Sequence, residues 1–331
     1  MTPVSAVLAK RYGALDTRDP RKVHRSATPR WGGIGILSSI LVGFLCLYFF
    51  NTPFRQLLQY SQNILRNGDV VLKLNLGEQL AGIIFGVVLL FIVGLIDDVR
   101  PMRSGMKFLF QIIAAMGAMI YGVRIFGLSV PGFEAYAHFP VWLTMFVTVM
   151  WLVGMTNAVN LIDGLDGLAA GVVAIISMAF IAVVLIQADA LRSASAHQLK
   201  MAGVIAAVMA GATLGFLVYN FHPAVIFMGD GGSMTLGFLV GCIAVTGTFK
   251  TTILAVLLVP FVLVAVPIVD MTMVFVRRVL NKQSPFTPDR GHLHHKLLDS
   301  GWTHREVVLL IYVVTLILAL ISLTVVGIKK T

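Results

Sequence analysis

Long apolar runs separated by short polar stretches make up most of the chain. Each run approaches the ~20 residues that a helix needs to cross the hydrocarbon core of a bilayer. The runs are continuous and lack the alternating apolar and polar positions of membrane strands, so we predict helices. The expected fold is an all-α, polytopic membrane bundle of about nine helices in a single domain, residues 1–331. The predicted spans lie near residues 32–50, 80–96, 107–122, 141–158, 168–186, 201–220, 233–247, 251–276 and 307–328.

The composition supports this prediction. The chain is 58% hydrophobic and 12% charged, with a mean hydropathy of +0.90, which lies outside the range of soluble globular domains. Its two cysteines, Cys46 and Cys242, lie within predicted spans without metal-ligand spacing, so we expect neither a disulfide nor a zinc site. Only residues 4–9 are apolar before the basic stretch that follows, so we expect no cleaved signal peptide.

Basic residues are unevenly distributed among the polar stretches. Residues 10–30 hold seven of the 25 Lys and Arg, directly before the first predicted span, and loops on the same side bring the total to 16. The positive-inside rule places this side in the cytoplasm. We therefore expect a multi-pass protein of the inner (plasma) membrane with its polar face in the cytoplasm. The net charge of +10 indicates topology and attraction to anionic lipid or phosphate, and the lack of a nucleic-acid motif argues against a nucleic-acid partner.

Polar side chains gather in four stretches on this same side. An ionised carboxylate near hydrocarbon costs roughly 2.5–3.5 kcal/mol, so these groups need a cation or a polar substrate to hold them. The carboxylates and amides are Asp97, Asp98, Asn157, Asn160, Asp163, Asp166 and Asp230, and the fourth stretch adds Arg290, His292, His294, His295 and Lys296.

Each stretch alone has a simpler interpretation: a polar turn, a solvated helix end, a glycine turn, or a zinc cluster of three histidines. Zinc is disfavoured because no cysteine accompanies the histidines and Arg290 and Lys296 would repel a cation. Together, carboxylates and bases at one membrane face favour a divalent cation that bridges a pyrophosphate, as phosphoryl transfer uses. Oxygen ligands favour Mg²⁺, with Mn²⁺ as the alternative. No base adjoins Asp230 in the sequence, so we expect its carboxylate to act without being neutralised.

At these residues the sequence resembles the polyprenyl-phosphate N-acetylhexosamine-1-phosphate transferase superfamily. The matching stretches are residues 29–33, 94–98 with Lys107, 157–167, 227–233 and 289–295. The last, Asp-Arg-Gly-His-Leu-His-His, resembles the branch that transfers GlcNAc-1-phosphate, whereas the branch that transfers phospho-MurNAc-pentapeptide shows three consecutive histidines. One departure is that the family usually has another span before the basic stretch, where this chain has only the apolar residues 4–9.

The resemblance implies transfer of GlcNAc-1-phosphate from UDP-GlcNAc to undecaprenyl phosphate with release of UMP. This would be the first lipid-linked step of a cell-envelope polysaccharide such as lipopolysaccharide or teichoic acid. Asp230 and Asn160 would bind Mg²⁺, while Asp97 and Asp98 would handle the lipid phosphate, with Asp97 favoured for accepting its proton or orienting it.

The resemblance also implies roles for the remaining site residues. His292 would belong to the catalytic groups together with Asp97, Asp98 and Asp230. Phe227 would stack on uracil, Asp166 and Asp163 would contact the nucleoside, and Asn157 would belong to the substrate-binding set. The residues that would neutralise phosphate charge are Lys107, Arg290, His292, His294 and His295.

Two other functions remain open. One is the phospho-MurNAc-pentapeptide transferase of peptidoglycan synthesis, from the same superfamily. The other is a membrane transporter, because intramembrane carboxylates and broken helices also mark carriers. The clustering of titratable groups at one face disfavours a transporter, with Asp270, roughly two turns inside the eighth predicted span, as the exception. The oligomeric state is also open, a homodimer included.

Overall fold

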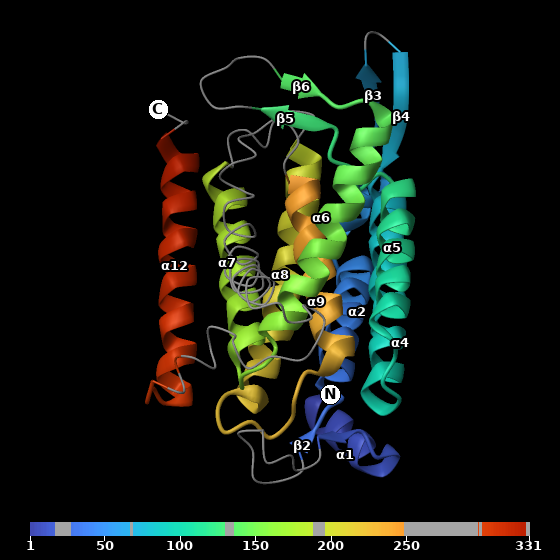
Figure 1. Cartoon of the computed structure of the whole chain (residues 1–331). Coiled ribbons are helices and arrows are strands. Elements are labelled where there is room, and N and C mark those ends of the chain that lie inside the picture. The colour runs from blue at the N-terminus through green and yellow to red at the C-terminus, as the bar shows by residue number, and fades with distance from the viewer. Residues whose placement is uncertain are drawn as a thin grey trace, which may run out of the picture.

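A computed structural model describes residues 1–16, 28–66, 69–129, 136–187, 196–247, 297 and 300–328. Its helices form an upright bundle (Figure 1). They are α1 (Thr2–Tyr12), α2 (Gly32–Phe50), α3 (Thr52–Gln59), α4 (Leu76–Val99), α5 (Ser104–Ile120), α6 (Val141–Ile162), α7 (Leu168–Ile186), α8 (Ala196–Asn220), α9 (Gly229–Gly247) and α12 (His304–Ile328).

Seven of the described helices are long and apolar enough to cross a membrane: α2, α4, α6, α7, α8, α9 and α12. The shorter apolar helix α5 coincides with the third predicted span. These helices confirm an all-α, multi-pass membrane bundle. The predicted span at 251–276 lies outside the described residues, so the count of nine stays a prediction.

Three short antiparallel strand pairs connect the helices. They are β1 (Leu15–Asp16) with β2 (Thr28–Pro29), β3 (Ser61–Arg66) with β4 (Asp69–Asn75), and β5 (Gly127–Ser129) with β6 (Tyr136–His138). The last two pairs lie at one end of the bundle, and α1 with β2 lies at the other (Figure 1). The prediction was based on membrane-length apolar runs. It therefore missed these strand pairs and the short helices α1 and α3, none of which contains such a run.

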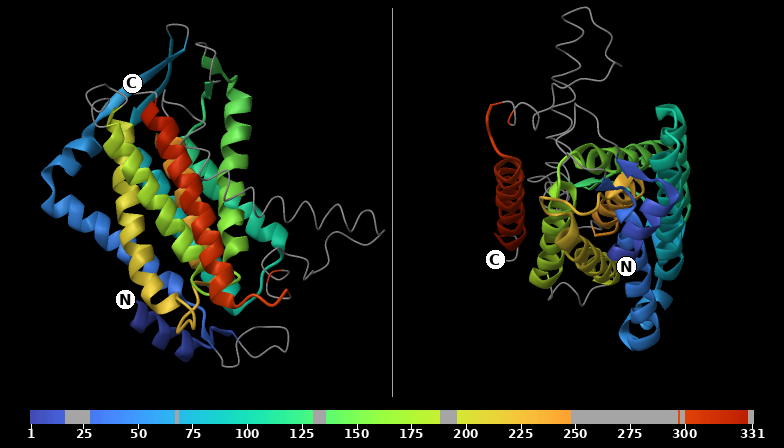
Figure 2. Two further views of the ribbon diagram at one scale, coloured as in Figure 1. Left: turned by 90° about the vertical axis from the view of Figure 1, so that its left-hand side faces the viewer. Right: turned by 90° about the horizontal axis from the view of Figure 1, so that it is seen from below.

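Helix α9 is the centre of the bundle. All its residues from Gly231 to Gly247 are buried, and it packs against α2, α4, α6, α7 and α8. Nine of its 19 residues are glycine, serine or threonine, and such small side chains suit a helix that touches neighbours on every side. Helix α12, by contrast, lies at the edge and packs against α7, as the side and bottom views show (Figure 2).

Local sequence signals account for several helix ends. The side chain of Asn75 caps α4 by accepting a hydrogen bond from the backbone N–H of Glu78 at 3.0 Å. Helix α4 ends at Val99, two residues before Pro101, where the proline disfavours helical backbone in the residue before it. The turn that follows leads directly into α5 and thereby sets two polar helix ends side by side.

Candidate active site

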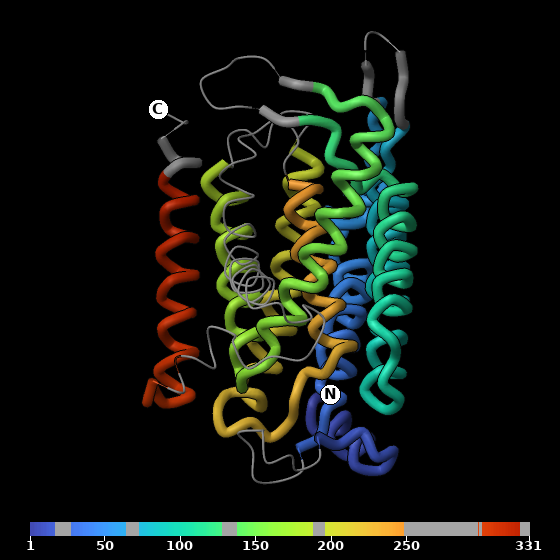
Figure 3. The backbone as a smooth tube through the Cα atoms, viewed as in Figure 1, coloured from blue at the N-terminus to red at the C-terminus, as the bar shows by residue number. Residues whose placement is uncertain are grey.

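The predicted carboxylates meet at the end of the bundle that lies opposite the β3–β4 and β5–β6 pairs. This end contains the last turn of α4, the first turns of α5 and α9, and the last turn of α6, as the backbone trace shows (Figure 3). Asp230 is the second residue of α9, although the sequence placed it in the loop before that helix. A carboxylate in the first turn is favoured by the exposed N–H groups there.

Glycines bring α4 and α9 into close contact beside these carboxylates. A Cβ atom on Gly94 would overlap the backbone of Gly231 and Asp230. Since Asp97 and Asp98 follow Gly94 by about one helical turn, this close approach sets both carboxylates next to the start of α9. Gly33 of α2 approaches Gly232 in the same way on another side of α9.

Lys107 joins two of the carboxylates. Its Nζ atom lies 2.6 Å from Oδ2 of Asp97 and 2.7 Å from Oδ2 of Asp230. The expectation that Asp230 has no neutralising base is therefore wrong, because the first turn of α5 supplies one from a distant part of the chain. The other oxygen of Asp97, Oδ1, accepts a hydrogen bond from the backbone N–H of Met102 at 2.7 Å. Both oxygens of Asp97 are thus engaged.

Asp98 has a different environment from its neighbour. Its Oδ1 accepts a hydrogen bond from the backbone N–H of Asp230 at 3.2 Å. Its Oδ2 is buried and has no hydrogen-bond partner within the part of the chain that the structure describes. A buried carboxylate oxygen without a donor is costly, so this oxygen is suited to a cation or a proton.

Amide side chains of α6 complete this cluster. Nδ2 of Asn160 donates to Oδ1 of Asp230 at 3.2 Å and to Oγ of Ser233 at 2.9 Å. The carbonyl oxygen of Asn160 is then the atom through which it would bind a cation. One turn earlier, Asn157 exchanges hydrogen bonds of 2.7 and 3.2 Å with Gln111 of α5. Gln111 and Ser233 were not predicted as site residues, and only their partners across the bundle identify them.

Asp163 follows the end of α6 beside the same cluster. Burial, together with the charges of Asp230 and Asp98, raises the pKa of the Asp163 carboxyl well above its usual range. Asp163 therefore belongs electrostatically with the cluster of Asp97, Asp98 and Asp230. The family resemblance implied a nucleoside contact for both Asp163 and Asp166, whereas the structure places these two carboxylates in different surroundings.

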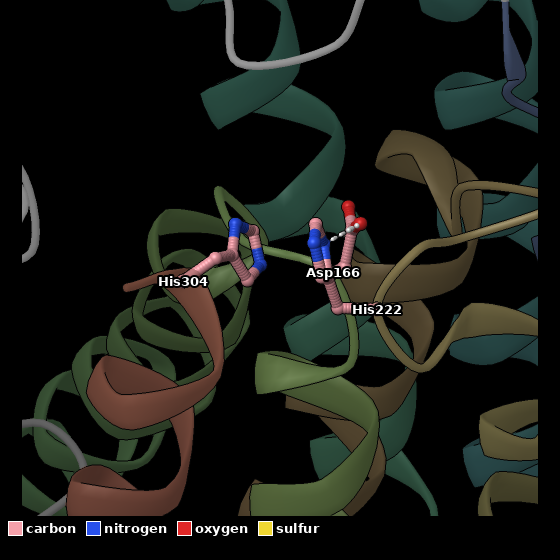
Figure 4. Close-up of side chains that lie close together, drawn as sticks. All are labelled: Asp166, His222 and His304. Atoms are coloured by element: carbon pink, nitrogen blue, oxygen red, sulfur yellow. Dashed lines mark hydrogen bonds and ion pairs between the residues drawn. The ribbon is translucent and has the colours of Figure 1, made fainter. Parts of the chain in front are cut away.

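Asp166 is buried and faces a second group of side chains (Figure 4). Its Oδ2 lies 2.8 Å from Nδ1 of His222 and accepts a hydrogen bond from the backbone N–H of Ala224 at 3.0 Å. The ring of His304, from the first turn of α12, stacks on His222 with centroids 4.3 Å apart. Potential ligand atoms of Asp166, His222 and His304 all lie within 4.8 Å of one another.

The stretch 29–33 positions Phe227 through its backbone. The N–H of Phe227 donates to the carbonyl of Pro29 at 2.8 Å, and its carbonyl accepts from the N–H of Gly32 at 2.9 Å. Gly33 continues this pairing by donating to Met228 at 2.8 Å. The matched glycines therefore serve to dock the loop before α9 onto the start of α2.

Arg290, His292, His294 and His295 lie outside the described residues, as does Asp270. Among the residues that are described, the oxygens of Asp98, Asp230 and Asn160 form a donor set that fits a hard divalent cation such as Mg²⁺. The unpartnered Oδ2 of Asp98 is the observation that supports this fit.

Comparison with known proteins adds relatives that match nearly the whole chain. A family model described as glycosyl transferase family 4 matches residues 80–248. The chain is 34% identical over 320 residues to the probable undecaprenyl-phosphate N-acetylglucosaminyl 1-phosphate transferase of Bacillus subtilis, which covers 97% of this chain and 79% of the relative. It is 35% identical over 324 residues to the decaprenyl-phosphate N-acetylglucosaminephosphotransferase of Mycobacterium leprae, covering 94% and 76%.

A relative with a different named activity also matches. The phospho-N-acetylmuramoyl-pentapeptide-transferase of Halalkalibacterium halodurans is 33% identical over 330 residues, covering 95% of this chain and 88% of the relative. It is a more distant match than the N-acetylglucosamine-phosphate transferases, although the percentages are similar.

Proposed function

The chain belongs to glycosyl transferase family 4, in its polyprenyl-phosphate GlcNAc-1-phosphate transferase branch, and we propose that it transfers GlcNAc-1-phosphate from UDP-GlcNAc to undecaprenyl phosphate. An oxygen of the lipid phosphate attacks the phosphorus that carries the sugar. A new P–O–P linkage forms as the bond to UMP breaks, so the products are undecaprenyl-pyrophosphoryl-GlcNAc and UMP. One diphosphate linkage is broken and another is formed, so the reaction needs no external energy source.

The observation that carries this proposal is the cluster at the start of α9. Three carboxylates and one ammonium, from Asp97, Asp98, Asp230 and Lys107, meet at the end of a membrane bundle. A lipid phosphate and a water-soluble nucleotide sugar can both reach such a position. Phosphoryl transfer needs positioned charge more than covalent chemistry from the protein, and this cluster supplies it.

The residues of the cluster have different proposed roles. Asp98, Asp230 and Asn160 would hold Mg²⁺, which supplies charge neutralisation for the pyrophosphate when it is bound. Because both oxygens of Asp97 are engaged, we assign Asp97 to orienting Lys107 rather than to taking a proton from the lipid phosphate. Asp97 holds Lys107 in place. Lys107 is then positioned to exchange a carboxylate partner for a phosphate oxygen as charge develops.

Binding of the nucleoside is assigned to the neighbouring loops. Phe227 would stack on uracil, and Asp166 would accept a hydrogen bond from the base, with Asn157 and Asp163 at the side of the pyrophosphate. Arg290, His292, His294 and His295 would add positive charge there. The site would face the cytoplasm of the inner membrane, where the basic stretches predict that this end of the bundle lies.

A reconstituted assay tests the proposal. Purified protein in nanodiscs is given undecaprenyl phosphate, Mg²⁺ and one UDP-sugar from a panel, and release of UMP is measured. We expect release with UDP-GlcNAc and loss of release on addition of EDTA, restored by Mg²⁺. Exchange of labelled UMP into UDP-GlcNAc, dependent on the lipid and without a membrane gradient, would separate this enzyme from a transporter. No UMP release from UDP-GlcNAc would refute the proposal.

A further inference from the structure

The carboxylate of Asp166 is fixed by two donors that reach the same oxygen. Nδ1 of His222 lies 2.8 Å from Oδ2, and the backbone N–H of Ala224 donates to it at 3.0 Å. Asp166 is almost fully buried, with 3% of its surface exposed. Hydrogen bonds to one oxygen from two directions set the rotation of the carboxylate about its Cβ–Cγ bond and so determine where Oδ1 points.

His222 is itself held from its other side. The ring of His304 is stacked on it at a centroid distance of 4.3 Å and an interplanar angle of 18°. His304 is buried and is the first residue of α12. The close-up shows His222 between His304 and Asp166 (Figure 4). A stacked ring restricts the rotation of the His222 side chain, which carries the donor that meets Asp166.

Helix α12 is anchored to the two loops that carry this group. Nη2 of Arg305 donates to the carbonyl of His222 at 3.2 Å, and the hydroxyl of Tyr312 donates to the carbonyl of Gly167 at 2.5 Å. The helix start is fixed by a capping box, in which Thr303 and Glu306 exchange hydrogen bonds of 2.7 to 3.3 Å. The fixed start of α12 therefore places His304 against His222.

We propose that His304 is a positioning residue for recognition of the base, acting through His222 to orient Asp166. An ionised carboxylate only accepts hydrogen bonds. A fixed Oδ1 therefore favours a base that presents an N–H, as uracil does at N3, and disfavours cytosine, whose N3 is an acceptor. The inference rests on the proposed function, because it concerns how that same site selects a uridine nucleotide.

The test uses the full-length protein in nanodiscs with Mg²⁺ and undecaprenyl phosphate. Variants His304→Ala, His304→Phe and His222→Phe are compared with wild type for kcat, for KM of each substrate, and for kcat/KM with UDP-GlcNAc against CDP-GlcNAc. His197→Ala is the matched control, since His197 also stacks on an aromatic ring, that of Tyr60, at the other end of α8.

Loss of one well-oriented hydrogen bond corresponds to about a tenfold change in affinity. We therefore expect His304→Ala to raise KM for UDP-GlcNAc about tenfold and to lower discrimination against CDP-GlcNAc by a similar factor. The KM for the lipid and kcat should stay within about twofold of wild type. His304→Phe keeps the stack and should restore most of the affinity, whereas His222→Phe removes the donor and should behave like His304→Ala.

The outcomes separate the inference from the function. If the wild type releases UMP from UDP-GlcNAc while His304→Ala matches it in KM and in base discrimination, the inference is refuted and the function stands. The inference also fails if His304→Phe is as impaired as His304→Ala, or if His222→Phe behaves like wild type. If His304→Ala does not fold, His304→Phe and His222→Phe still test the inference, because KM for UDP-GlcNAc and base discrimination should be near wild type in the first and impaired in the second. An inactive wild type refutes the function itself.

Discussion

Lys107 and Asp230 lie 123 positions apart in the sequence, yet Nζ of one is 2.7 Å from Oδ2 of the other. This ion pair joins the start of α5 to the start of α9. Because the same ammonium also binds Asp97, a single cation links three helices at the proposed site. Its removal therefore affects both the stability of the bundle and the chemistry.

We expect Lys107→Met to lower stability and nearly abolish turnover. The Lys107 side chain is about a quarter exposed, so screening reduces the cost below that of a fully buried pair, to about 1–2 kcal/mol. Thermal unfolding in detergent should show a Tm lower by about 2–5 °C. Lys200→Met, an exposed lysine on α8, is the control. An unchanged Tm and kcat in the Lys107 variant would contradict this account.

Asp230→Asn should abolish turnover and weaken the dependence on Mg²⁺. The substitution keeps the volume of the side chain and removes the charge that would hold the cation. Asp98→Asn should lose turnover as well, because the buried Oδ2 is the proposed cation ligand. Rates over a Mg²⁺ titration measure both variants, with Glu78→Gln at the opposite end of α4 as control. Near-normal rates for Asp230→Asn at limiting Mg²⁺ would disprove its assignment.

Gly94→Ala should displace α4 from α9 and impair activity. The added methyl group would overlap the backbone of Gly231 and Asp230, which cannot yield as a flexible side chain can. We expect a loss of about 1–3 kcal/mol in stability and at least tenfold lower kcat. Gly154→Ala on α6 is the matched control, because nothing lies within 4 Å of its added Cβ. Equal behaviour of the two variants would show that the close approach is unimportant.

Orientation in the membrane can be tested by cysteine labelling. In a background without Cys46 and Cys242, Ser104→Cys at the start of α5 should react with an impermeant maleimide only after the membrane is opened. Ser284→Cys, which lies outside the described residues, should behave in the same way. Asn63→Cys in β3 should react from outside intact cells. Labelling of Ser104→Cys and Ser284→Cys from outside would reverse the topology.

The donor sugar is the last prediction. The stretch between Arg278 and Trp302 offers only about two dozen residues, too few for a peptide-binding domain. We expect UDP-GlcNAc to be used and UDP-MurNAc-pentapeptide to be refused. Competition kinetics with both donors measures this preference, and comparable kcat/KM values would move the chain to the other branch without changing the chemistry.

Much of the bundle follows from the sequence because a membrane helix needs a long apolar run and little else. Where an apolar run has no clear start, the observed helix end differs from the predicted one. Helix α9, for example, begins at Gly229 rather than near residue 233. The strands β3 to β6 and the short helices carry no comparable signal. Their placement depends on the helices that they connect, which a local pattern does not describe.

The candidate site was predictable as a set of residue types but not as a set of partners. Asp97, Asp98, Asp163 and Asp230 were found because carboxylates are rare in this chain. The different surroundings of these carboxylates could not be predicted. The two oxygens of Asp97 are bound by Lys107 and Met102, and the burial of Oδ2 of Asp98 depends on the close approach of α9. His304 carried no signal in the sequence, since it stands directly before an apolar run and its stacking partner His222 lies more than 80 residues away.

The shared ammonium also bears on how the protein is made. Asp97 and Lys107 lie on either side of one short turn, so both leave the ribosome together and can enter the membrane as a matched pair. Asp230 emerges 123 residues after Lys107 and joins a partner that is already in place. Since chains fold from the N-terminus during synthesis, the pair of Asp97 and Lys107 can form first, and its third member joins when α9 arrives.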